Sequence, residues 1–213
     1  VGHPDFIPKF SILDPTFTYS VPVSQTAAGT ADMMSHTFES YFTLNDGAFL
    51  INRLAEGILQ TCIHYGPIAV KEPENYEARA NLMWASSLAI NGLLKNGKEC
   101  PWSVHAMEHA LSAYYDVTHG VGLAILTPAW MEYILDDSTV QMFAEYGWNV
   151  WQLDRNGDAL TTAKAAIQKT REFFISLGIP ATLRELGIPE DMLESMAKSA
   201  PKGGDTIHGV KPL

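Results

Sequence analysis

Apolar residues recur at about every third or fourth position along most of this chain, which is the spacing that places them on one face of an α-helix. These stretches are separated by Gly-Pro, Asn-Gly and Pro breaks, which favour helix ends. Beyond the N-terminal segment, no stretch alternates convincingly between apolar and polar positions, so strands are not expected there. The pattern predicts an all-α helical bundle with helices over residues 25–42, 52–65, 76–94, 140–151, 161–177 and 190–200.

The N-terminal segment differs from the rest because prolines interrupt it at four positions. Each proline fixes its own φ angle and pushes the preceding residue toward extended geometry. The run Phe10-Ser-Ile-Leu13 also has a strand-like character. We therefore expect residues 1–23 to form a short extended segment and residues 24–213 to form one helical domain.

The composition is that of a globular domain, with 213 residues of which 46% are hydrophobic. The net charge of −10 comes from dispersed Asp and Glu without a basic stripe, which argues against a nucleic-acid partner and fits a small neutral substrate. No apolar run reaches the roughly 18 residues that span a bilayer, and the N-terminus lacks signal-peptide features, so we expect no membrane association and a cytoplasmic location. Cys62 and Cys100 stand alone, and we interpret both as reduced packing residues.

Three of the seven histidines, His105, His109 and His119, are close together in the sequence. His105 and His109 are four residues apart on a predicted amphipathic helix, so their rings project from one face. Gly120 and Gly122 predict that this helix breaks at His119, where the chain can turn the third ring back toward the first. Because lone histidines on apolar faces are often core residues, this stretch by itself leaves a functional site and a plain core equally open.

A second cluster favours the functional interpretation. Asp32 and His36 are also four residues apart on a predicted helix, and their apolar neighbours indicate that the pair faces inward. Together with His105 and His119, they offer one oxygen and three nitrogens to a metal. Three neutral imidazoles and one carboxylate around a divalent ion give the site a net charge of about +1, which suits a Lewis acid. The donor set favours Zn²⁺ or Fe²⁺ over Ca²⁺ and Mg²⁺.

The sequence resembles the metal-binding helical domain of the iron-activated alcohol dehydrogenases, in the branch of the butanol dehydrogenases and related aldehyde reductases. The resemblance implies a dehydroquinate synthase-like C-terminal fold. In that family an Asp and a His four residues apart, and two further His fourteen residues apart, hold the metal; Asp32, His36, His105 and His119 match them. His109 matches a family histidine beside the nicotinamide, which implies a catalytic and cofactor-binding role in proton handling. The stretches that carry the resemblance are Phe10-Ser-Ile-Leu-Asp-Pro15, Ala27-Ala-Gly-Thr-Ala-Asp-Met-Met-Ser-His36, Ala80-Asn-Leu-Met-Trp-Ala85, Asn91-Gly-Leu-Leu94, His105-Ala-Met-Glu-His109 and Asp116-Val-Thr-His-Gly120.

The resemblance also implies a reaction, in which a metal-bound substrate oxygen is stabilised while hydride passes between a small alcohol or aldehyde and NAD(P)H. Family members carry an N-terminal nucleotide-binding half with a glycine-rich loop, and no such unit is found in this sequence. We therefore expect a C-terminal domain cut at the front, with residues 1–23 left from the domain junction, and trimmed of a final helix at the back. Alone it should hold Fe²⁺ or Zn²⁺ without turning over, and the full-length enzyme is a candidate homodimer.

Two alternatives remain open from the sequence. His105-Ala-Met-Glu108-His109 also matches the His-x-x-Glu-His signature of inverted zinc peptidases, in which both histidines bind zinc and the glutamate activates water. That function would leave the other predicted ligands without a role. The third possibility is a non-enzymatic helical interaction module whose histidines are buried polar residues. We interpret the remaining prominent residues as solvated side chains (Glu56, Glu72, Glu74) or packing residues (Trp84, Trp130, Trp148, Trp151).

Overall fold

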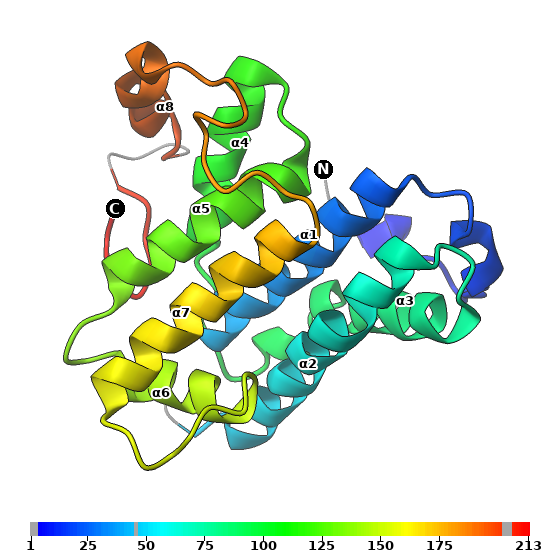
Figure 1. Ribbon diagram of the computed structural model, residues 1–213, viewed down its shortest axis with the longest axis horizontal. Helices are drawn as coiled ribbons and strands as arrows, with labels where there is room; N and C mark the ends of the chain where they lie inside the picture. Colours follow the sequence, from blue (N-terminus) through cyan, green and yellow to red (C-terminus); the bar gives the residue numbers. More distant parts are fainter. Residues whose placement is uncertain (1–3, 45–46, 202–205) are drawn as a thin grey trace.

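The computed structural model describes residues 4–44, 47–201 and 206–213 as a bundle of helices (Figure 1). These described residues contain no β-strand, which confirms the all-α prediction. The α-helices are α1 (Val23–Tyr41), α2 (Phe49–Lys71), α3 (Tyr76–Ile90), α4 (Ser103–Tyr115), α5 (His119–Ile134), α6 (Val140–Asn149), α7 (Ala159–Ser176) and α8 (Leu193–Ser199). Short 3₁₀ helices are η1 (Pro4–Phe6), η2 (Pro15–Thr18), η3 (Leu93–Lys95) and η4 (Glu190–Met192).

Helix α1 runs through the middle of the bundle (Figure 1) and packs against both α2 and α5. Its Met34 and Phe38 are fully buried in the main core, together with Phe143 and Tyr146 of α6. The rings of Phe38 and Tyr146 meet edge to face, with their centroids 5.7 Å apart. Burial of this aromatic surface fixes α1 firmly in the fold, so the polar side chains that α1 presents to α4 and α5 are held in place.

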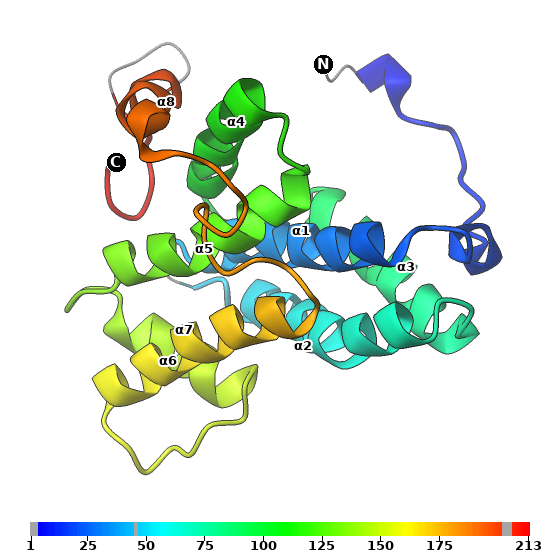
Figure 2. The same ribbon diagram turned by 45° about the horizontal axis from the view of Figure 1, so that its top comes forward.

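Helices α4 and α8 lie together on one side of the bundle, as Figure 2 shows. Residues 206–213 lie beside α4 and are held there by hydrogen bonds. Ile207 and Leu213 exchange two backbone hydrogen bonds, and the Ser103 hydroxyl donates to the His208 carbonyl at 3.1 Å. Residues 206–213 therefore form part of the wall beside α4.

The N-terminal segment is less extended than predicted. It contains η1 and η2, and the Asp14 carboxylate begins η2 by accepting a hydrogen bond from the Thr16 backbone N–H at 3.0 Å. Phe10 and Ile12 of the strand-like run are largely exposed, and no strand lies beside them among the residues that the structure describes. Strand propensity is not realised here because no sheet edge is available. Residues 1–3 lie outside the described residues.

Helix α2 continues past Gly66-Pro67 to Lys71, so the predicted end at residue 65 is wrong. Gly66 packs against α1, where a Cβ atom would lie 2.7 Å from the Thr30 methyl group. One turn later Ala69 is fully buried in a small cluster with α3 residues. Proline removes one helical hydrogen bond, and burial of this last turn outweighs that loss.

Glu56 and Trp84 occupy environments opposite to those predicted. Glu56 is only 5% exposed, because its carboxylate accepts hydrogen bonds from the Tyr41 hydroxyl, the Arg53 guanidinium and the Asn149 amide at 2.8, 2.6 and 2.9 Å. Trp84 was expected to pack and is 60% exposed. Two of these donors, Tyr41 on α1 and Asn149 on α6, lie on other elements, and local periodicity contains no information about such partners.

Both cysteines are free thiols, as predicted. Cys62 is completely buried in the main core, and this burial raises the pKa of its thiol to about 12. Cys62 is therefore a packing residue. Among the described helices, none is long and apolar enough to cross a membrane.

Candidate metal centre

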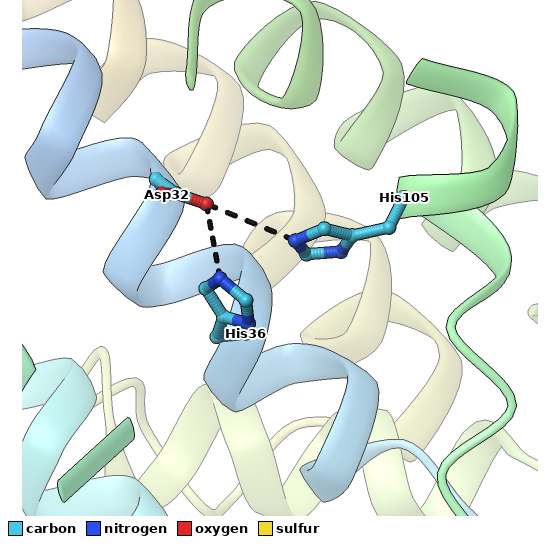
Figure 3. A group of neighbouring side chains, drawn as sticks. All are labelled: Asp32, His36 and His105. Carbon is cyan, nitrogen blue, oxygen red and sulfur yellow. Dashed lines mark ion pairs between the residues drawn. The ribbon is translucent and has the colours of Figure 1, made fainter. Parts of the chain in front are cut away.

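Three of the four predicted ligand residues converge on a carboxylate oxygen of the fourth, Asp32. Asp32 Oδ1 lies 3.4 Å from the Nε2 atom of His36, 3.8 Å from that of His105 and 3.7 Å from that of His119. Figure 3 shows three of these side chains pointing toward one another, with Asp32 and His36 on α1 and His105 on α4. The structure therefore brings together one oxygen and three nitrogens from three helices.

His119 reaches this cluster from a different position than expected. The sequence predicted one helix that breaks at His119, whereas α4 ends at Tyr115 and His119 is the first residue of α5. Asp116 adopts a left-handed conformation with φ of 51° and reverses the chain between the two helices. The turn brings the ring centroids of His105 and His119 to 5.2 Å, so the expected return of the third histidine toward the first is observed.

Two glycines after His119 permit this arrangement. A Cβ atom on Gly120 would overlap the backbone of Ala28 on α1, lying 2.6 Å from its carbonyl carbon. A Cβ atom on Gly122 would lie 2.8 Å from Cγ of Glu108 on α4. Glycine at both positions therefore lets α5 approach α1 and α4 closely, which is what places His119 beside Asp32.

The charges of these groups perturb one another. Burial by itself would raise the pKa of Asp32, but the neighbouring imidazoles of His105, His36 and His119 together lower it below its ordinary value. Burial lowers the pKa of His36 to about 4 despite the nearby Asp32 carboxylate. Burial also acts to lower the pKa of His105, but Asp32 and Glu39 outweigh it and raise that pKa to about 9. The cluster thus combines an ionised carboxylate with histidines of very different basicity.

The donor set fits a divalent transition metal. Asp32 Oδ1 and His105 Nε2 are buried and have no hydrogen-bond partner among the described residues, although both point into the cluster. Buried polar atoms without partners are costly, and a cation between them would satisfy both. Nitrogen-rich ligand sets of this kind suit Zn²⁺ or Fe²⁺.

Two buried glutamates support the histidines and were not predicted in that role. Glu39 on α1 lies with Oε1 3.2 Å from His105 Nδ1, and Glu108 on α4 contacts His119 Nδ1. Each glutamate follows a predicted ligand histidine by three residues, and this spacing is the sequence signal that could have revealed them. Glu108 is completely buried and holds Ser112 and His119, so it is not placed to activate water as the peptidase alternative requires.

His109 lies beside the cluster and is exposed. Its ring stacks on that of His119, with centroids 5.4 Å apart and planes 20° apart, and its centroid is 6.3 Å from that of His105. His105 and His109, the two zinc ligands of the His-x-x-Glu-His signature, fall in different groups of possible metal-binding side chains: His105 lies with Asp32 and His36, and His109 lies with Glu108 and His119. His119 connects the two groups, because its Nε2 atom lies 3.7 Å from Asp32 Oδ1.

A cavity of about 530 Å³ opens onto the cluster. Its wall combines the imidazoles with apolar side chains and with residues 206–208. Such a wall suits a small ligand that has one polar group and an apolar remainder. His208 and Thr206 line it without having been predicted, because their backbone reaches the cavity only through the fold of residues 206–213. The lining residues include His36, His105, His109, His119, Trp102 and Ile207.

The chain is similar to known proteins over most of its length. The family model described as "Fe-containing alcohol dehydrogenase family, C-terminal" matches residues 26–210. NADH-dependent butanol dehydrogenase A of Clostridium acetobutylicum is 63% identical over 214 residues, covering 100% of this chain and 55% of that protein. The NADPH-dependent aldehyde reductase YqhD of Escherichia coli is 39% identical over 203 residues, covering 95% of this chain and 52% of that protein.

Solved structures of such proteins have the same fold as this chain. The crystal structure of NADH-dependent butanol dehydrogenase A from Thermotoga maritima superposes with a TM-score of 0.90 at 30% identity, covering 100% of this chain and 55% of that one. The chain thus spans about half the length of the curated relatives that it matches.

Proposed function

Because the chain belongs to the Fe-containing alcohol dehydrogenase family, we propose that it is the metal-binding part of an NAD(P)-dependent alcohol dehydrogenase or aldehyde reductase. The relatives are named as NADH-dependent butanol dehydrogenases and as an NADPH-dependent aldehyde reductase. The proposed substrates are small alcohols or aldehydes. The observation that carries the proposal is the convergence of three imidazole Nε2 atoms on Asp32 Oδ1 beside an open cavity.

In this proposal, Asp32, His36, His105 and His119 hold one Fe²⁺ or Zn²⁺ ion. Such an ion, when bound, supplies a Lewis acid for the substrate oxygen. The four residues keep their donor atoms facing one point, which lowers the reorganisation needed for reaction. The apolar part of the cavity wall, such as Trp102 and Ile207, excludes water and accommodates the aliphatic part of the substrate.

We assign His109 to proton handling near the nicotinamide, as the family resemblance implies. Its imidazole lines the cavity and stacks on the ligand His119, so it lies next to the proposed reacting oxygen without being a ligand. An imidazole that lines the cavity and is also exposed to solvent can pass a proton between substrate and solvent. Nicotinamide binding is assigned to the part of the relatives that this chain does not cover, so the 213-residue chain alone should not oxidise NADH.

A chimera tests the proposed function. The 213 residues replace the matching residues of C. acetobutylicum butanol dehydrogenase A, to which they are 63% identical. The chimera should oxidise NADH with butyraldehyde in a metal-dependent manner. Asp32→Ala should lower its kcat/KM by roughly 100-fold or more, because loss of this ligand weakens binding of the cation that would stabilise the developing negative charge. A folded chimera without activity, or full activity in the variant, would contradict the proposal.

A further inference from the structure

Helices α1 and α4 carry the same pattern, a ligand histidine followed three residues later by a buried glutamate. The pairs are His36 with Glu39 and His105 with Glu108. In each pair the glutamate contacts the ligand histidine of the next helix that contributes to the cluster, so Glu39 meets His105 and Glu108 meets His119. We propose that Glu39 and Glu108 are positioning residues, each holding Nδ1 of one histidine so that its Nε2 faces Asp32. This inference rests on the proposed function, because it assumes that the cluster binds a metal.

Glu39 performs two tasks with one oxygen. Its Oε1 atom accepts a hydrogen bond from the His105 backbone N–H at 2.9 Å and lies 3.2 Å from Nδ1 of the same residue. His105 is the third residue of α4, so its N–H has no acceptor within the helix, and Trp102 at the N-cap makes no side-chain cap bond. A carboxylate from α1 therefore caps α4, which the helix dipole favours, and orients the ligand ring at the same time.

Glu108 makes the corresponding connection from α4 to α5. One carboxylate oxygen contacts His119 Nδ1, and the other accepts a hydrogen bond from the Ser112 hydroxyl. The side chain has no exposed surface, and Gly122 leaves the space that it occupies. The carboxylate is thus held on both sides, so the ring of His119 has one preferred orientation.

Capping of α4 uses only one oxygen of Glu39 and does not by itself account for a buried carboxylate there. Its second oxygen, Oε2, is buried and has no hydrogen-bond partner among the described residues, which is unfavourable for the fold. A carboxylate behind a ligand imidazole fixes the ring tautomer and strengthens the metal bond. His36 provides an internal contrast, because its Nδ1 is buried and no partner is found for it in the described part of the chain. Two of the three rings are therefore held by carboxylates.

Zinc affinity of the 213-residue chain is the first test, measured by competition with a chelating dye. Glu39→Gln and Glu108→Gln should each weaken Zn²⁺ binding by about 10- to 100-fold. Glu56→Gln is the matched control, because Glu56 is also buried but bonds to Tyr41, Arg53 and Asn149 instead of the cluster. The control should bind Zn²⁺ like the parent chain, and unchanged affinity in both test variants would overturn the inference.

Nitrogen NMR of the histidine rings in the zinc-loaded chain separates positioning from general loosening. Glu39→Gln should shift the Nδ1 resonance of His105 and leave that of His119, and Glu108→Gln should do the reverse. Ser112→Ala keeps both carboxylates but removes the hydrogen bond that holds Glu108, so it should shift only the Nδ1 resonance of His119. This variant replaces Glu108→Gln in the test if the glutamate variant does not fold. If every variant moves both rings together, the inference is wrong. If the folded parent chain binds no Zn²⁺, the proposed metal centre itself fails, and this inference with it.

Discussion

At the residue scale, the proposed binding of a metal ion depends on the protonation of a few neighbouring side chains. With its pKa raised to about 9 by Asp32 and Glu39, His105 carries a proton at pH 7 when no metal is bound. His36, with a pKa lowered to about 4 by burial, is neutral at the same pH. The two imidazoles face the same carboxylate oxygen, yet only one of them must lose a proton before its Nε2 can bind a cation.

This difference predicts a proton release on metal binding. At pH 7, Zn²⁺ should displace about one proton from His105 per ion bound. Because the free site holds this proton and the loaded site does not, affinity should increase about tenfold per pH unit as pH rises and should level off above about pH 9. Titration calorimetry in two buffers of different ionisation enthalpy measures the number of protons released per ion bound. Zinc binding with no proton released at pH 7 would contradict the prediction.

Single residues also show where sequence interpretation succeeds and where it stops. Asp32 and His36 could be paired from their spacing alone, because residues four apart share a helix face. The supporting contact between Glu39 and His105 joins side chains 66 residues apart in the sequence, and no periodicity encodes it. Glu56 was misassigned for the same reason, since two of its three donors, Tyr41 and Asn149, come from other elements.

At the element scale, the junction of α4 and α5 shapes the site. The apolar spacing typical of a helix continues through the histidine stretch, and Gly120 and Gly122 predicted a break at His119. The actual reversal uses Asp116 in the left-handed region, which non-glycine residues adopt uncommonly and which Asp tolerates better than most. The glycines serve instead as points of close approach, a role that depends on the neighbouring helix and so could not be predicted from the sequence.

The role of Gly120 can be tested by substitution. Gly120→Ala places a methyl group against the backbone of Ala28, so α5 must shift away from α1. We expect the free energy of unfolding to fall by about 1–3 kcal/mol or more, and metal affinity to fall because His119 moves with α5. Chemical denaturation and dye competition measure the two effects.

Gly57→Ala is the control for this substitution. Gly57 lies within α2, and a Cβ atom there would meet nothing within 4 Å. Alanine at an unobstructed helical position should raise stability by roughly 0.5–1 kcal/mol. If Gly120→Ala behaved like this control, the close approach would not position His119.

At the scale of the whole molecule, the cluster of Asp32 and the three imidazoles forms only because three helices meet. Asp32 and His36 lie on α1, His105 lies on α4, and His119 begins α5. The all-helical class and most helix positions followed from periodicity, because burial of an apolar face imposes it. The arrangement of the helices, the histidine that each buried glutamate contacts and the part of the cavity wall formed by residues 206–213 depend on contacts between helices, which one sequence does not reveal.

The central claim is that one divalent ion is bound by residues from all three helices. The most direct measurement is metal content per chain by elemental analysis, after anaerobic reconstitution of the 213-residue chain with Fe²⁺ or Zn²⁺. We predict about one ion in the parent chain and in His64→Ala, a histidine on α2 outside the cluster, and loss of the ion in His119→Ala. An ion retained in folded His119→Ala, or no ion in the folded parent chain, would contradict the account.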